Sequence, residues 1–159
     1  MSPADGVMIA PVDDRWDASA GEGDALDQVL AASRLLGSDR SLANFGGGNT
    51  SAKGTATDHA GRDVRVMWVK GSGSDLATME RRHFTGLRLD EILPLIERHE
   101  MSDEEMVAYL ARCQLDPTMP RCSIETLLHA FVPAEHVHHT LPDGINVLAG
   151  TRDGEALVR

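Results

Sequence analysis

Residues 44–53 read Asn-Phe-Gly-Gly-Gly-Asn-Thr-Ser-Ala-Lys, three glycines followed by small polar residues. The glycines allow close approach of the backbone to another group, and Asn49, Thr50 and Ser51 offer hydrogen bonds, a combination that suits an oxyanion. The spacing matches neither GxxxxGK[ST] nor GxGxxG after a strand, so a nucleotide site is not indicated. A flexible glycine turn explains the same spacing equally well.

The residues around this stretch predict an antiparallel hairpin and a helix before it. Residues 49–57 are small and polar, residues 58–63 are rich in turn formers, and residues 64–69 (Val-Arg-Val-Met-Trp-Val) form a buried β run. Upstream, apolar residues at helical spacing predict a helix from Asp24 that ends at a C-cap near Gly37. Those apolar residues are Leu26, Val29, Leu30, Leu35 and Leu36.

Further elements follow the hairpin. Residues 84–89 are a candidate strand, and Asp90 is a candidate cap for a short helix with Pro94 in its first turns. Ser102, with Glu105 three positions later, matches a capping box and predicts another helix.

Helices and a strand are also predicted in the last part of the chain. Ser123 is a candidate N-cap, residues 136–141 predict a strand, and Pro142 begins a helix. Residues 153–159 resemble the first turns of another helix. We therefore expect an N-terminal arm over residues 1–23 and one α/β domain over residues 24–159.

Composition restricts the class of protein. The 159 residues are 42% hydrophobic, enough for one core, and the formal charge of −10 disfavours broad contact with nucleic acid or an anionic membrane. Two cysteines without CxxC spacing, no signal peptide and no long apolar run indicate a soluble, cytoplasmic protein. A local phosphate site remains compatible with this charge, because backbone N–H groups can hold an anion.

A second glycine-containing loop, Lys-Gly-Ser-Gly-Ser-Asp at residues 70–75, follows the predicted buried strand. Exposed amides and hydroxyls at a strand end can form an anion-binding nest, and two such loops can meet on one phosphate. Taken alone, the loop is more typical of a strand-to-helix turn that Asp or Ser caps.

A third segment, residues 121–129, places Glu125 at the start of an apolar helix. Such a carboxylate can transfer protons, or it can simply be a favourable charge at a helix N-terminus. His129 lies four residues later, where it can bond to Glu125 or pack in the core.

A fourth segment, His-Val-His-His-Thr-Leu-Pro-Asp at residues 136–143, raises the hypothesis of metal binding. In a strand, His136 and His138 share one face, whereas His139 and Leu141 share the other. A pair of surface histidines is the commoner explanation for His136 and His138.

Taken in order, these four segments resemble the class II aldolase and adducin N-terminal domain family, from about Trp16 onward. The likeness is greatest to the aldolase part of bifunctional rhamnulose-1-phosphate aldolase/alcohol dehydrogenases. The resemblance implies a three-layer α/β fold with a central, mostly antiparallel sheet flanked by helices. It also implies a phosphate-binding set and an acidic catalytic residue, Glu125. The implied phosphate-binding residues are Asn49, Ser72, Gly73 and Ser123.

The resemblance further implies a metal-dependent aldehyde-lyase. A divalent metal, zinc, holds the oxygens of a ketose phosphate, and His139 corresponds to the first metal-binding histidine. In rhamnulose-1-phosphate aldolases the products are dihydroxyacetone phosphate and lactaldehyde. The expected partners are thus a phosphorylated sugar and copies of the same chain, commonly in a tetramer.

This sequence departs from the family pattern at one ligand position. The second histidine of the family follows two residues after the first, and here that residue is Leu141, which cannot bind a metal. The family's third histidine comes from farther along the chain, so we expect it beyond Arg159 and expect this domain to be C-terminally incomplete. Impaired cleavage is one expectation; a non-catalytic, adducin-like assembly or binding module is the alternative.

Overall fold

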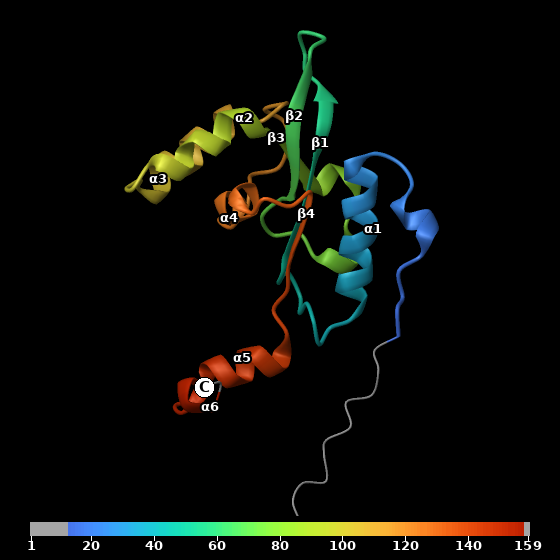
Figure 1. Ribbon diagram of the computed structural model, residues 1–159, viewed down its shortest axis with the longest axis vertical. Coiled ribbons are helices and arrows are strands. Elements are labelled where there is room, and N and C mark those ends of the chain that lie inside the picture. Colours follow the sequence, from blue (N-terminus) through green and yellow to red (C-terminus); the bar gives the residue numbers. More distant parts are fainter. Residues whose placement is uncertain (1–12, 158–159) are drawn as a thin grey trace, which may run out of the picture.

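The computed structural model describes residues 13–157, which form an α/β domain around one four-stranded antiparallel sheet. The strand order is β3-β2-β1-β4, and helices cover both faces of the sheet (Figure 1). The predicted class, a mostly antiparallel sheet flanked by helices, is confirmed. Of the predicted N-terminal arm, residues 1–12 lie outside the described part, and the remainder contains the short helix η1 (Ala18–Gly21).

The predicted hairpin is the centre of the sheet. Strand β1 (Asn49–Thr57) pairs with β2 (Asp63–Lys70), and β2 pairs in turn with β3 (Phe84–Arg88). Strand β4 (His136–His139) adds to the other side of β1 and is an edge of the sheet. Because β1 and β4 come from distant parts of the chain, their pairing brings the glycine-rich stretch beside the histidine cluster.

Helix α1 (Ala25–Ser38) covers one face of the sheet. The predicted helix is confirmed, and Asp24, the expected first residue, is its N-cap. Gly37 is not its C-cap, because the helix continues to Ser38. A Cβ at Gly37 would lie 2.1 Å from the backbone nitrogen of Ala77, so this glycine allows close packing against η2 (Leu76–Thr78). The core on this face consists of Leu26, Val29, Ala43, Ala52, Leu76, Met79 and Phe84.

The other face of the sheet carries four helical segments. They are α2 (Leu89–Ile92), η4 (Leu93–Glu97), α3 (Asp103–Arg112) and α4 (Thr126–Phe131). Their apolar residues form a second core with the opposite side of the strands. It contains Met67, Val69, Leu87, Leu89, Ile92, Leu110, Cys113 and Ala130.

Two predicted helix caps on this face were wrong and one is confirmed. Ser102 and Glu105 form the capping box of α3. Asp90 is not a cap, since α2 already begins at Leu89 after Arg88. Ser123 is not the N-cap of α4 either: the residues after it first form a turn, in which the Thr126 N–H donates to the Ser123 carbonyl.

The C-terminal elements extend away from the sheet (Figure 1). Strand β4 ends at His139, so the predicted strand was too long and Leu141 lies beyond it, where its N–H donates to the Leu42 carbonyl at 2.9 Å. Helices α5 (Asp143–Gly150) and α6 (Gly154–Leu157) follow, the first at the predicted Pro142. The helix η3 (Arg81–His83) completes the set of elements. None of the helices in residues 13–157 has the length and apolarity that a membrane crossing requires.

Candidate active site

Glu125 is the centre of a polar cluster at the start of α4. Its Oε2 accepts hydrogen bonds from Asn49 Nδ2 at 2.9 Å and from Ser123 Oγ at 3.0 Å. Its Oε1 lies 2.9 Å from His139 Nδ1. Three other residues that were predicted to form a site, Asn49, Ser123 and His139, therefore all contact Glu125.

The surroundings of Glu125 keep it ionised. Burial alone would raise the pKa of this carboxyl, but the hydrogen bonds from Asn49 and Ser123 counteract burial, and the pKa lies below its usual value. A carboxylate that is ionised at neutral pH can accept a proton.

Strand register explains why His139, and neither neighbouring histidine, reaches this cluster. His139 pairs with Asn49 across the β1–β4 ladder, and directly opposed residues point to the same face. His138 pairs with Thr50, and Thr50 Oγ1 bonds to Ser33 of α1 on the opposite face. The prediction that His139 points away from His136 and His138 is confirmed.

His136 and His138 lie together on the α1 side. Their rings are 6.3 Å apart in an edge arrangement, and His136 Nε2 bonds to Gln28 Oε1 at 3.1 Å. The pKa of His138 is lowered, first by burial and then by the positive charge of His136. The two form a histidine pair at the edge of the sheet, apart from Glu125.

His129 is fully buried beside the cluster. The sequence left two interpretations open for it, a bond to Glu125 or packing in the core. Its Nδ1 lies 2.8 Å from Ser51 Oγ, and burial lowers its pKa to about 4, so the imidazole is neutral at physiological pH. The helical spacing from Glu125 was the available signal, but the bond goes to Ser51 on β1.

Several polar atoms of this cluster are buried without a hydrogen-bond partner among residues 13–157. They are Asn49 Oδ1, His129 Nε2 and His139 Nδ1, the last of which approaches Glu125 without the alignment of a hydrogen bond. An unpaired buried polar atom costs free energy, and binding sites are where such atoms occur in native proteins.

The first glycine-rich segment forms the turn directly before Asn49 and so positions Asn49 in this cluster. Gly46 and Gly48 have φ of 71° and 73°, which residues with a Cβ rarely adopt. A Cβ at Gly48 would lie 3.0 Å from Leu76 Cδ1 and 3.1 Å from the His139 carbonyl. Close packing and left-handed backbone thus both require glycine there.

The second glycine-containing loop is attached to the segment before Glu125. Gly71 forms a β-bridge with Cys122, and the Ser72 N–H donates to the Arg121 carbonyl at 2.9 Å. Ser72 and Gly73 are exposed, and Gly73 has a φ of 81°. The loop therefore presents the Ser72 hydroxyl and the Gly73 backbone next to the segment that carries Ser123.

Asp75 connects the two glycine loops, a role that sequence reasoning missed. Its carboxylate accepts from Arg40 Nη1 at 2.9 and 3.1 Å, from the Gly46 N–H at 3.2 Å and from the Ala77 N–H at 2.9 Å. The hydrogen bond from Arg40 is the largest influence on its pKa, which is lowered. The last contact makes Asp75 the N-cap of η2, as the turn reading of this loop predicted.

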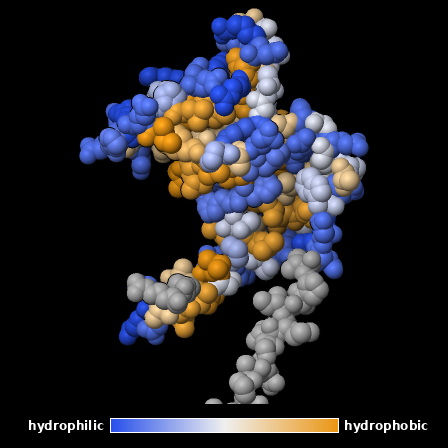
Figure 2. Space-filling view, viewed as in Figure 1, coloured by the Kyte–Doolittle hydropathy of each residue, from blue (hydrophilic) through white to orange (hydrophobic). Residues whose placement is uncertain are grey.

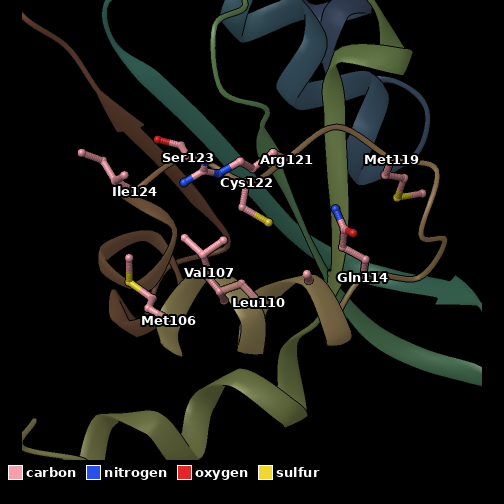
Figure 3. Close-up of a pocket in the computed structure, with 10 residues that line it drawn as sticks. Met106, Val107, Leu110, Gln114, Met119, Arg121, Cys122, Ser123 and Ile124 are labelled. Carbon is pink, nitrogen blue, oxygen red and sulfur yellow. The ribbon is translucent and has the colours of Figure 1, made fainter. Parts of the chain in front are cut away.

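An apolar cavity of about 300 Å³ adjoins the cluster (Figure 3). It lies between α3 and the segment that leads to Glu125, and Ser123 is one of its lining residues. The lining residues include Met106, Val107, Leu110, Met119, Cys122 and Ile124.

Comparisons with known proteins identify the family of this domain. Residues 27–158 match the class II aldolase and adducin N-terminal domain family, and the chain belongs to that family.

Two similar proteins are longer than the region that this chain matches. It is 54% identical over 132 residues to the uncharacterized oxidoreductase YuxG of Bacillus subtilis (strain 168), covering 83% of this chain and 19% of that protein. The N-terminal class II aldolase domain of a conserved protein from Thermoplasma acidophilum superposes with a TM-score of 0.81 at 44% identity. That match covers 89% of this chain and 66% of the solved chain, so this chain spans only part of either relative.

Class II aldolases generally depend on a divalent metal. Within residues 13–157 no three His, Cys, Asp or Glu side chains gather in a way that could hold a metal ion. His139 and Glu125 are the two donors that meet, and Leu141 lies against Gly47 instead of offering a ligand. These residues do not by themselves make a metal centre.

Proposed function

We propose that this chain is a ketose-phosphate-binding domain of class II aldolase type, whose reaction is retro-aldol cleavage of a ketose 1-phosphate. The observation that supports this best is the contact of Glu125 with both Asn49 and Ser123. A proton acceptor thereby lies against two of the residues assigned to phosphate binding, each from a different segment.

The chemistry assigned to these residues is binding and proton transfer. Cleavage of the carbon–carbon bond begins when a base removes the proton of the substrate hydroxyl, and ionised Glu125 is suited to that step. Asn49 Oδ1, buried and without a partner in residues 13–157, can accept a hydrogen bond from another sugar hydroxyl. The glycine loops and Ser123 orient the phosphate.

The substrate we propose is rhamnulose 1-phosphate, cleaved to dihydroxyacetone phosphate and lactaldehyde. Support for this sugar comes from the likeness of the four segments to rhamnulose-1-phosphate aldolases, while the family as a whole supports a phosphorylated sugar.

Calorimetric titration of the purified chain with dihydroxyacetone phosphate and with rhamnulose 1-phosphate tests binding. A coupled assay for dihydroxyacetone phosphate, with and without added Zn²⁺, tests cleavage. We expect binding by the wild type and by Glu125→Gln, and any measurable cleavage in the wild type alone. Absence of binding to both compounds would refute the proposal.

A second candidate function is a non-catalytic, adducin-like homo-oligomer, which Leu141 and exposed apolar side chains favour. Figure 2 shows apolar surface over α4 and along α5. Ile124 and Leu128 at α4 are 77% and 54% exposed, and Val147 on α5 is 65% exposed. Such surface is typical of contacts between chains.

Light scattering after size exclusion, with and without dihydroxyacetone phosphate, separates the candidates. A stable oligomer that binds no sugar phosphate would favour the assembly function, whereas a monomer would refute it. The resemblance to class II aldolases also implies an oligomer. An oligomer that binds the sugar phosphate therefore supports the first proposal.

A further inference from the structure

Lys70, the last residue of β2, is the buried cation of this domain. This residue is 3% exposed, and no other Lys or Arg in residues 13–157 is buried. Its Nζ lies 3.5 Å from the Gly46 carbonyl, so the ammonium group reaches the first glycine turn, while its backbone leads directly into the Gly71–Gly73 loop.

The ammonium group of Lys70 lacks a proper partner. In the part of the chain that the structure describes it forms no ion pair, and its one hydrogen bond is the long contact to Gly46. Burial lowers the pKa of Lys70, and the more distant carboxylates of Glu125 and Asp75 counteract that effect. A buried charge with so little compensation is costly, so its presence at this position needs a reason.

The residues assigned to the phosphate lack a positive charge of their own. Asn49, Ser72, Gly73 and Ser123 are neutral, and the nearest acidic groups are Glu125 and Asp75. A phosphate monoester carries nearly two negative charges at neutral pH. Hydrogen bonds from neutral groups alone leave those charges uncompensated in a site that already contains carboxylates.

Two other cations lie near the loops, Arg40 and Arg121. Both oxygens of Asp75 bind Arg40, whose guanidinium also lies 4.1 Å from the centre of the Phe45 ring. Arg121 is exposed and belongs to the lining of the apolar cavity (Figure 3). Arg40 is thus already paired and Arg121 lies at the surface, whereas Lys70 is the buried cation in contact with the first glycine turn.

We propose that Lys70 is a further substrate-binding residue, whose ammonium group pairs with the phosphate of the ketose phosphate held by the two glycine loops. This inference rests on the proposed function, since it assigns a role within the same site. In the absence of ligand, the unpaired charge of Lys70 lowers the stability of the fold; the ligand removes that cost when it binds.

The chain offers a matched control, because Lys53 is its other lysine. Lys53 lies on β1, and its Nζ donates to the Val132 carbonyl, away from both glycine loops. Lys70→Met and Lys53→Met remove the same charge from the same sheet. The experiment is calorimetric titration of the wild type and both variants with dihydroxyacetone phosphate and with inorganic phosphate, together with thermal unfolding in the presence and absence of each.

We expect Lys70→Met to bind dihydroxyacetone phosphate about 10- to 100-fold more weakly, the range for loss of a hydrogen bond to a charged group. Its melting temperature without ligand should equal or exceed that of the wild type, whereas the increase on adding phosphate should largely disappear. Lys53→Met should keep the wild-type affinity. A residue with only a structural role would lower stability and leave affinity unchanged, and that result would overturn the inference.

Nuclear magnetic resonance of the wild type provides a measurement that does not depend on folding of the variant. With ¹³C-labelled lysine the chain gives two Cε signals, and Lys53→Met identifies which belongs to Lys70. Phosphate should shift the Lys70 signal and leave the Lys53 signal in place; binding that moves neither signal would overturn the role of Lys70 while the proposed function stands. Failure of the wild type to bind either phosphate compound would overturn both.

Discussion

Glu125 and Asn49 are joined by a hydrogen bond of 2.9 Å although 76 residues separate them in the chain. Asn49 is held in place by the β1–β4 ladder, and Glu125 by the turn that precedes α4. The charge state of the proposed proton acceptor therefore depends on contacts between segments that are distant in sequence.

Replacing Asn49 with alanine should raise the pKa of Glu125, because one of the two hydrogen bonds that lower it is lost. Titration of the Glu125 carboxyl by ¹³C resonance measures this directly. Asn146 lies on α5 and donates to the Leu141 carbonyl; Asn146→Ala removes that bond, serves as the control and should leave the Glu125 pKa unchanged. An unchanged Glu125 pKa in Asn49→Ala would contradict the assignment.

His129 should make the stability of the domain dependent on pH. Its pKa is lowered from 6.5 to about 4 in the folded state, so between these values the unfolded chain binds more protons. The stability it contributes is complete above pH 6.5 and is lost as the pH falls towards 4, in total about 3 kcal/mol at roughly 1.4 kcal/mol per pH unit. Urea unfolding from pH 8 to pH 5 should show a shallower dependence in His129→Gln; equal slopes would disprove the effect.

Two glycines with similar backbone angles should respond differently to substitution. Gly48 and Gly61 have φ of 73° and 76°, but nothing lies within 4 Å of a Cβ at Gly61, whereas a Cβ at Gly48 meets Leu76 and the His139 carbonyl. We expect Gly61→Ala to cost about 1 kcal/mol from backbone strain alone. Gly48→Ala should cost more and also weaken binding of dihydroxyacetone phosphate. Equal losses in urea unfolding would show that packing at Gly48 is unimportant.

Leu141→His should strengthen metal binding by supplying the imidazole that the family pattern places two residues after His139. Competition for Zn²⁺ against a chromophoric chelator should show an affinity gain of roughly tenfold or more, since two imidazoles replace one. Thr140→His adds the same side chain one position earlier and should give little gain. If the two variants bind Zn²⁺ equally well, the position of the imidazole relative to His139 does not matter.

Local patterns in the sequence predicted most of the fold. The apolar period of α1, the capping box of Ser102 and Glu105, and the hairpin around residues 58–63 are all signals contained within a few residues. Gly37 was misread because its role is decided by contact with Ala77, forty residues away in the chain, and not by its own helix end. Tertiary contacts of this kind leave no local signature.

The site was predicted less completely than the fold. Strand alternation was enough to separate His139 from His138, and the hydrogen bond between Asn49 and Glu125 joins two residues that the four ordered segments had singled out. The sequence could not predict the hydrogen-bond partner of His129. Helical spacing relates His129 to Glu125, whereas its hydrogen bond is to Ser51 on a strand. Lys70 was likewise passed over, since its burial follows from packing of the loops around β2.

The pairing of β4 with β1 has a consequence for how the site forms during folding. Four residue pairs connect these strands, at an edge of the sheet and across a long interval of chain. Contacts between distant segments form late, and short edge strands open most readily by local fluctuation. We expect the amides of β4 to exchange with solvent faster than those of the β1–β2 hairpin, so that the Glu125–His139 contact is among the last to assemble and the first to be lost.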